Sequence, residues 1–223
     1  MVKSILPLIC LFFISINLLA QQKVIYREHF RNNKNNWSLH HDKNFVVQIE
    51  KGELFVKKLQ LNRESNGCLW YSSEIPGFEA DRNFTITFLA KIISLEDELK
   101  AVDFQWGELT DSDTVAHKKF SLYQMIIKPT DISLAKFNRS EGWTYYDRYA
   151  NGHVGGGAEI GLLFKKNRYN KYEIQQKDGR LYFRFNDKLV YEREVTPIRG
   201  SEIGIQQCLK SAWKISKIVV RQG

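Results

Sequence analysis

Residues 170–192, NKYEIQQKDGRLYFRFNDKLVYE, are the stretch that most constrains the fold of this chain. Apolar and polar side chains alternate through three short segments, which are separated by two turn sequences. Asp178-Gly179 readily takes the positive φ of a tight hairpin, and Asn186-Asp187 marks the second turn. A period of two that is interrupted by such turns is typical of an antiparallel meander with one buried face.

The rest of the chain repeats this pattern, and few stretches favour helix. Short strands are expected at residues 24–30, 45–50, 53–58, 68–73, 84–93, 102–106, 120–127, 132–137, 143–149, 172–176, 181–186, 189–192, 202–207 and 214–220. Many short strands without alternating helices indicate an all-β protein in which two antiparallel sheets stack as a sandwich. A length of 223 residues fits one such sandwich.

The first twenty residues have the composition of a secretory signal peptide. Lys3 supplies the positive charge, residues 5–19 are apolar, and Ala20 precedes the expected cleavage point. The apolar run is shorter than the roughly 20 residues that a membrane span needs, although a retained anchor is the alternative. We therefore expect residues 1–20 to be a signal peptide and residues 21–223 to be a single β-sandwich domain without a membrane span. The protein would then be exported by a bacterium, to the periplasm or the extracellular space.

The formal net charge of +8 bears on possible partners. A basic exported protein can meet acidic glycans, but a merely solvated surface explains the charge equally simply. Lysine and arginine are spread along the chain rather than clustered, so we expect no nucleic-acid partner.

Two cysteines, Cys68 and Cys208, remain after the signal peptide. Cys68 begins an expected strand and Cys208 directly follows one, and an oxidising compartment permits a disulfide if their Cα atoms lie within about 7 Å. Their spacing excludes a cysteine-based zinc site. No cofactor is expected. Calcium is possible, but Asp111-Ser-Asp113 lacks the glycine and the distal glutamate of an EF-hand loop, so no motif supports it.

Several motifs, taken in order, resemble those of the concanavalin A-like lectin and glucanase jelly rolls, nearest to exported bacterial domains of the LamG-like or DUF1080-like kind. They are FRNNKNNW at 30–37, GEL at 52–54, FTITF at 84–88, FQWG at 104–107, NKYEI at 170–174, FRFND at 183–187 and IGI at 203–205. This resemblance implies two stacked antiparallel sheets, one of them often concave and facing a glycan. It does not imply one activity, because sites are grafted onto folds.

Retaining glucanases of this superfamily carry an E-x-D-x-(x)-E motif, which places two carboxylates about 5 Å apart on one sheet face. The motif is absent here, because Asp103 and Glu108 are five residues apart and so lie on opposite faces of a regular strand. We therefore expect a non-catalytic glycan- or ligand-binding protein. A glycoside hydrolase or lyase with a non-standard acid pair and a protein-interaction domain are the alternatives.

Two strands supply the candidate binding residues. If Phe104 and Trp106 face the core, the polar side chains between them project from the opposite face. In WTYYDRY at 143–149, regular alternation places Trp143, Tyr145, Asp147 and Tyr149 on one face. Flat rings with a polar handle suit the CH faces of sugars, although core packing would also explain them. The predicted ligand-binding residues are Asp103, Gln105, Trp143, Tyr145 and Arg148.

Overall fold

The computed structural model describes residues 22–59, 69–95, 102–108, 121–128, 132–138, 140–150, 160–165, 167–207 and 211–223. The predicted signal peptide, residues 1–20, lies outside this part of the chain. Within the described ranges, no helix is both long enough and apolar enough to cross a membrane.

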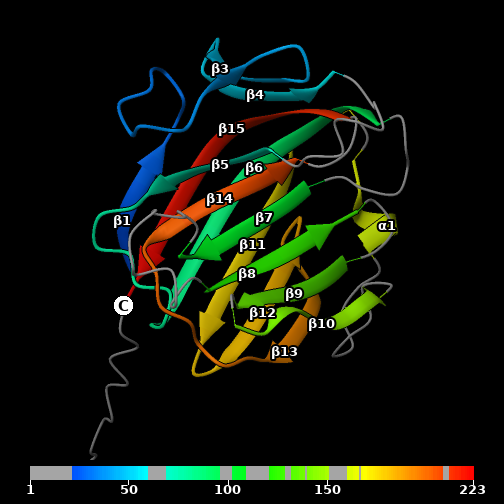
Figure 1. The fold of residues 1–223 in the computed structure, drawn as a ribbon. Coiled ribbons are helices and arrows are strands. Elements are labelled where there is room, and N and C mark those ends of the chain that lie inside the picture. The colour runs from blue at the N-terminus through cyan, green and yellow to red at the C-terminus, as the bar shows by residue number, and fades with distance from the viewer. Residues whose placement is uncertain are drawn as a thin grey trace, which may run out of the picture.

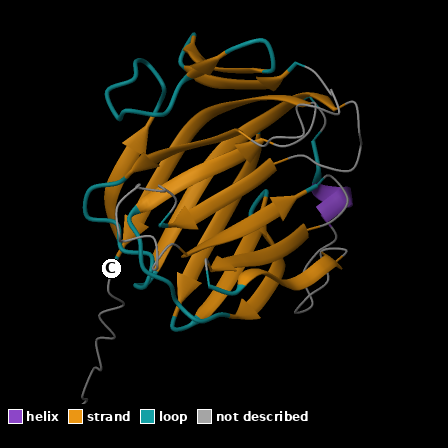
Figure 2. Cartoon of the chain, viewed as in Figure 1, coloured by secondary structure: helices purple, strands orange, loops and turns teal. Residues whose placement is uncertain are grey.

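Within the described residues, the larger of two sheets has nine strands, in the order β13-β12-β11-β6-β15-β4-β3-β2, with β1 also paired to β15. All of its pairs are antiparallel (Figures 1 and 2). The strands are β1 (Lys23–Glu28), β2 (His40–His41), β3 (Phe45–Glu50), β4 (Glu53–Lys58), β6 (Phe84–Leu95), β11 (Asn170–Lys177), β12 (Arg180–Phe185), β13 (Lys188–Glu194) and β15 (Ser211–Gln222).

The second sheet has six strands in the described part of the chain, in the order β10-β9-β8-β7-β14-β5, and is also antiparallel. The strands are β5 (Leu69–Glu74), β7 (Val102–Gly107), β8 (Ser121–Ile127), β9 (Ile132–Asn138), β10 (Gly142–Ala150) and β14 (Glu202–Gln207), and one helical turn, α1 (Ile160–Leu163), follows β10. The predicted all-β, two-sheet antiparallel jelly-roll sandwich is confirmed (Figure 1).

The meander at residues 170–192 forms as its sequence predicts. Strands β11, β12 and β13 pair in order, and each turn contains two consecutive residues of positive φ. The values are 52° and 75° at Asp178 and Gly179, and 47° and 68° at Asn186 and Asp187. Two positive φ angles define a type I′ turn, whose twist matches that of the strands it joins.

The apolar core lies between the two sheets and is continuous from one to the other. Phe88 of β6 stacks on Phe104 of β7 across the interface, with ring centroids 4.6 Å apart and an interplanar angle of 10°. Its other face stacks on Tyr172 of β11 at 4.7 Å. All three rings are buried, so this stack joins the centres of both sheets.

The pairing of β5 with β14 bears on the predicted disulfide. Its register is constant from Glu74 opposite Glu202 to Leu69 opposite Gln207. Cys68 and Cys208 lie outside the described residues. In the sequence, Cys68 directly precedes Leu69 and Cys208 directly follows Gln207. The disulfide stays a prediction.

Phe88→Ala should lower the free energy of unfolding by about 3–5 kcal/mol, because it removes a ring that packs on both sides and leaves a cavity. Phe88→Leu should cost less, since it keeps part of the apolar volume. Tyr145→Ala, at an exposed aromatic position, should change stability by about 0.5 kcal/mol at most. Urea denaturation measures all three, and an unchanged midpoint for Phe88→Ala would contradict the role given to this stack.

Candidate functional site

The outer face of the six-stranded sheet, turned away from the core, carries the predicted polar pair. Phe104 and Trp106 of β7 belong to the core, so Asp103 and Gln105 project from the opposite side, as alternation predicts. Both are nevertheless buried: Asp103 is 8% exposed and Gln105 is 1% exposed. The middle of this face is therefore not an ordinary solvated surface.

Gln105 is bound to two other amides on the neighbouring strands. Its Nε2 donates to Oε1 of Gln124 on β8 at 2.8 Å and to Oε1 of Gln206 on β14 at 3.4 Å. Sequence reasoning missed Gln124 and Gln206. The alternation of β8 could have indicated Gln124, because this residue stands between the core residues Tyr123 and Met125 and therefore faces outward. These two hydrogen bonds link β8, β7 and β14 across the centre of the face.

An aromatic platform, defined as Phe137, Trp143 and Tyr145, occupies one edge of this outer face. Trp143 and Phe137 are register partners with ring centroids 5.1 Å apart, and Trp143 stacks on Tyr145 at 6.2 Å. Trp143 is 37% exposed and Tyr145 is 41% exposed. Core packing was the alternative explanation for the aromatic residues of this strand. It holds for Tyr146, which packs against the core.

The alternation predicted for residues 143–149 ends at Tyr145. The register of β10 shifts between Tyr145 and Asp147, so that Tyr145 pairs with Ala135 while Asp147 pairs with Leu134. Regular pairing therefore does not continue through residues 143–149, since a bulge interrupts the alternation of a strand, and the side chains of Asp147 and Tyr149 lie outside the described part. The side chain of Arg148 lies outside the described part, and its role stays a prediction.

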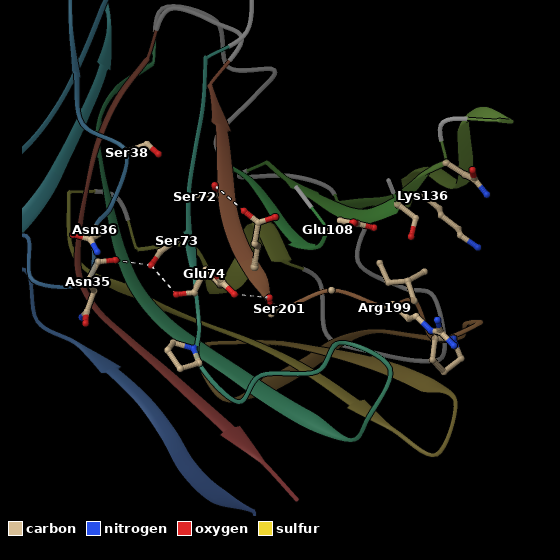
Figure 3. A pocket seen from close by; sticks show the side chains of 17 residues that line it. Asn35, Asn36, Ser38, Ser72, Ser73, Glu74, Glu108, Lys136, Arg199 and Ser201 are labelled. Carbon is tan, nitrogen blue, oxygen red and sulfur yellow. Dashed lines mark hydrogen bonds between the residues drawn. The ribbon is translucent and has the colours of Figure 1, made fainter. Parts of the chain in front are cut away.

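A polar pocket of about 1120 Å³ lies at the end of the six-stranded sheet where β5 and β9 end and β8 and β14 begin (Figure 3). Its lining includes three carboxylates, two cations and several serines and asparagines, and it contains no aromatic side chain. The charged members are Glu74, Glu108, Lys136, Arg199 and Glu202. No sequence motif joins these residues, because they come from different strands and loops.

Glu74 and Glu202 are directly opposite each other on β5 and β14. Register partners in an antiparallel pair have Cα atoms about 4.5–5.5 Å apart and point to the same face. Ser72 Oγ donates to Glu202 Oε1 at 3.4 Å, and Ser201 Oγ donates to Glu74 Oε1 at 3.4 Å (Figure 3). Glu74 is exposed and Glu202 is 8% exposed, so two acids in different environments share one pocket wall.

The loop that brings Asn35, Asn36 and Ser38 to the pocket is tied to the core. The buried Glu28 carboxylate accepts from the Phe30 backbone N–H at 2.6 Å and from the Asn35 amide. Trp37 Nε1 donates to the Tyr26 hydroxyl at 3.0 Å. Burial raises the pKa of Tyr26 to about 12, so this hydroxyl stays protonated under ordinary conditions.

The segment leading into β14 lies against the backbone of β7. Gly107 and Gly200 both have a φ of 128°, and a Cβ on Gly200 would lie 2.0 Å from the carbonyl carbon of Gly107. The Tyr123 hydroxyl donates to the Thr196 carbonyl at 2.8 Å, and burial raises the pKa of Tyr123. These contacts fix the wall of the pocket that includes Arg199 and Ser201.

The platform and the pocket lie at the same end of the sheet. Asn138, which lines the pocket, pairs with Gly142, the residue before Trp143. Trp143 and Glu202 stand in one row across β10, β9, β8, β7 and β14. Four strand spacings of about 4.8 Å separate them by roughly 19 Å, which is a span for an extended ligand.

The structure adds little on metals. Among the described residues, no group of three or more histidine, cysteine, aspartate or glutamate side chains could hold a metal ion. Asp111 and Asp113, which carried the possible calcium loop, lie outside those residues.

No protein-family model matches the sequence, and no curated protein sequence matches it either. Among solved structures, the chain is similar to a Bacillus subtilis protein of unknown function with a galectin-like fold, at a TM-score of 0.58 and 11% identity, over 91% of this chain and 97% of that one. It is similar to a chain from work on endo-acting O-glycanases, which prominent members of the human gut microbiota express to initiate mucin breakdown (TM-score 0.56, 10% identity, 90% of this chain and 99% of that one). It is also similar to the catalytic domain of an endo-1,3-beta-glucanase (laminarinase) from Thermotoga petrophila (TM-score 0.54, 10% identity, 90% of this chain and 98% of that one).

At such low identity these likenesses establish the fold alone. The fold is a concanavalin A-like sandwich, as the motifs of the sequence indicated. The nearer resemblance to LamG-like or DUF1080-like domains stays a prediction.

Gly200→Ala should lower the free energy of unfolding by about 3 kcal/mol or more, because the added methyl group meets the Gly107 backbone and the φ is unfavourable. Gly142→Ala is the matched control. Its φ of 73° is also left-handed, but a Cβ there meets nothing within 4 Å, so the cost should be only about 1 kcal/mol. Equal losses in urea denaturation would contradict the close approach of the two glycine segments.

Proposed function

We propose that this protein is an exported, non-catalytic glycan-binding β-sandwich. The ligand would lie across the outer face of the six-stranded sheet, from the aromatic platform to the polar pocket. The observation that carries the proposal is the exposure of Trp143 and Tyr145 on that face, although the adjacent Tyr146 packs against the core. Core packing does not explain two adjacent rings that stay partly in solvent, and their flat apolar faces with polar edges suit a sugar ring.

The pocket supplies the hydrogen-bonding and charged groups that the aromatic platform lacks. Its serine, asparagine and carboxylate oxygens are hydrogen-bond partners for hydroxyl groups, and Lys136 and Arg199 can bind an acidic substituent. Solved structures of similar fold include a laminarinase and a chain from work on O-glycanases, which agrees with a glycan ligand. The buried amides of Gln105, Gln124 and Gln206 would hold the sheet between the two subsites rigid, rather than contact the ligand.

A second function, glycoside hydrolysis, is favoured by one observation. Glu74 and Glu202 face the same pocket from directly opposite positions on neighbouring strands. Retaining glycosidases hold two carboxyl groups about 5–5.5 Å apart, with one acting as nucleophile and one as acid and base. A pair on two strands would be the non-standard acid pair that the missing single-strand motif leaves open.

Residues 21–223 should bind at least one neutral or acidic glycan on an array, and Trp143→Ala should weaken binding by about tenfold or more, equivalent to 1.4 kcal/mol. Tyr145→Ala should also weaken it. Tyr182→Ala, which removes a partly exposed ring from the other sheet, should leave affinity unchanged and controls for general damage. Equal binding by the wild type and Trp143→Ala would reject the platform as a binding site.

Incubation with polysaccharides should release no new reducing ends if the protein only binds. Release that disappears in both Glu74→Gln and Glu202→Gln, but persists in Glu108→Gln, would establish the hydrolase instead. Glu108 is the suitable control because it lines the same pocket but is not the register partner of either acid.

A further inference from the structure

The outer face of the nine-stranded sheet, on the opposite side of the sandwich, has its own small pocket. On β6, Phe84, Ile86, Phe88, Ala90 and Ile92 belong to the core, so the residues between them face outward. A pocket of about 340 Å³ lies over β11, β6 and β15. These three strands are adjacent in the sheet (Figure 1). Its lining residues are Thr87, Leu89, Lys171, Glu173, Lys217 and Arg221.

The charges in this pocket do not cancel. Lys171 is bound to Asp187 at 2.5 Å and lies 3.6 Å from Glu173, and Glu173 also faces Arg184 at 3.5 Å. The single carboxylate of the lining is thus shared between two cations. Lys217 and Arg221 form no ion pair with any residue of the described ranges. Lys217 and Arg221 are therefore two cations at the border of the pocket that no described carboxylate neutralises.

Thr87 provides a second, independent observation. Its hydroxyl oxygen is buried and has no hydrogen-bond partner. In the sheet, Thr87 pairs with Val219, which lies midway along β15 between Lys217 and Arg221. A buried hydroxyl without a partner costs free energy, and a bound ion that accepts from it is one explanation for such a group.

We infer that this pocket is an anion site for the sulfate groups of a sulfated glycan. An ammonium group, a guanidinium group and a hydroxyl donor around one small cavity match the oxygens of a tetrahedral oxyanion. Arg27 of β1 pairs with Val219, so it extends the cationic strip one strand further, as a polymer with repeated charges requires. A membrane surface fits less well, since Leu89 and Val219 are not exposed and offer no apolar side chain for insertion.

Heparin is the probe for this site, in titrations of residues 21–223 at several salt concentrations. Lys217→Gln/Arg221→Gln should weaken binding by about tenfold or more. It should also reduce the dependence of log affinity on log salt, because fewer counterions are released when fewer cations contact the polymer. Thr87→Val should weaken binding severalfold while leaving the melting temperature unchanged or higher, because it removes an unpaired hydroxyl at constant shape.

The matched control is Lys34→Gln/Lys43→Gln, which removes two exposed loop cations that do not line this pocket. It should bind heparin as the wild type does. An equal loss in both double variants would show that net charge alone attracts the polymer, and no loss in Lys217→Gln/Arg221→Gln would exclude the pocket. Either result overturns the inference.

Two further binding experiments distinguish a sulfated glycan from other sources of the anion. Hyaluronate, which has carboxylates but no sulfates, should bind more weakly than heparin. Vesicles of phosphatidylcholine and phosphatidylglycerol should not bind at a salt concentration at which heparin does, and preferential vesicle binding would replace the proposal with a membrane contact. Loss of heparin binding in these variants with retained Trp143-dependent glycan binding would separate this site from the one on the six-stranded sheet.

Discussion

The contact between the inner faces of the two sheets is the constraint on which the rest of the structure depends. Phe88 stacks between Phe104 and Tyr172, so one aromatic ring joins β6 and β11 of one sheet to β7 of the other. Burial of such rings supplies most of the driving force for a sandwich, because a single sheet has no other way to remove one face from water. Every second residue of the central strands is therefore committed to the core, and only the alternate residues remain for recognition.

The two outer faces use those alternate residues differently. On the six-stranded sheet they form a buried amide cluster, with exposed rings at one edge and a carboxylate-rich pocket at one end. On the nine-stranded sheet, β6, β11 and β15 present lysine, arginine and threonine. Lys171, Lys217 and Arg221, which belong to strands far apart in the sequence, are thus brought by strand pairing onto one surface. Residues far apart in the chain become neighbours only through register.

This distinction explains how much the sequence could predict. Alternation within one strand predicted the meander, both of its turns, and the common outer face of Asp103 and Gln105. It also predicted that Trp143 and Tyr145 share a face. It could not predict that Gln124 and Gln206 would bind Gln105, or that Glu74 would stand opposite Glu202, because pairing between strands leaves no periodic signal. The shift after Tyr145 was also hidden, since a bulge is a property of a strand pair and not of one strand.

The irregular register of β10 has a consequence for solubility. This strand is the border of its sheet, and a border strand carrying exposed aromatic rings is the usual template for uncontrolled association of β proteins. Shifts on both sides of Asp147 break the even spacing of its main-chain donors and acceptors, so a second molecule cannot add a regular strand there. The register shift that follows Tyr145 thus also protects this exposed edge of the sheet from strand-by-strand association with other molecules.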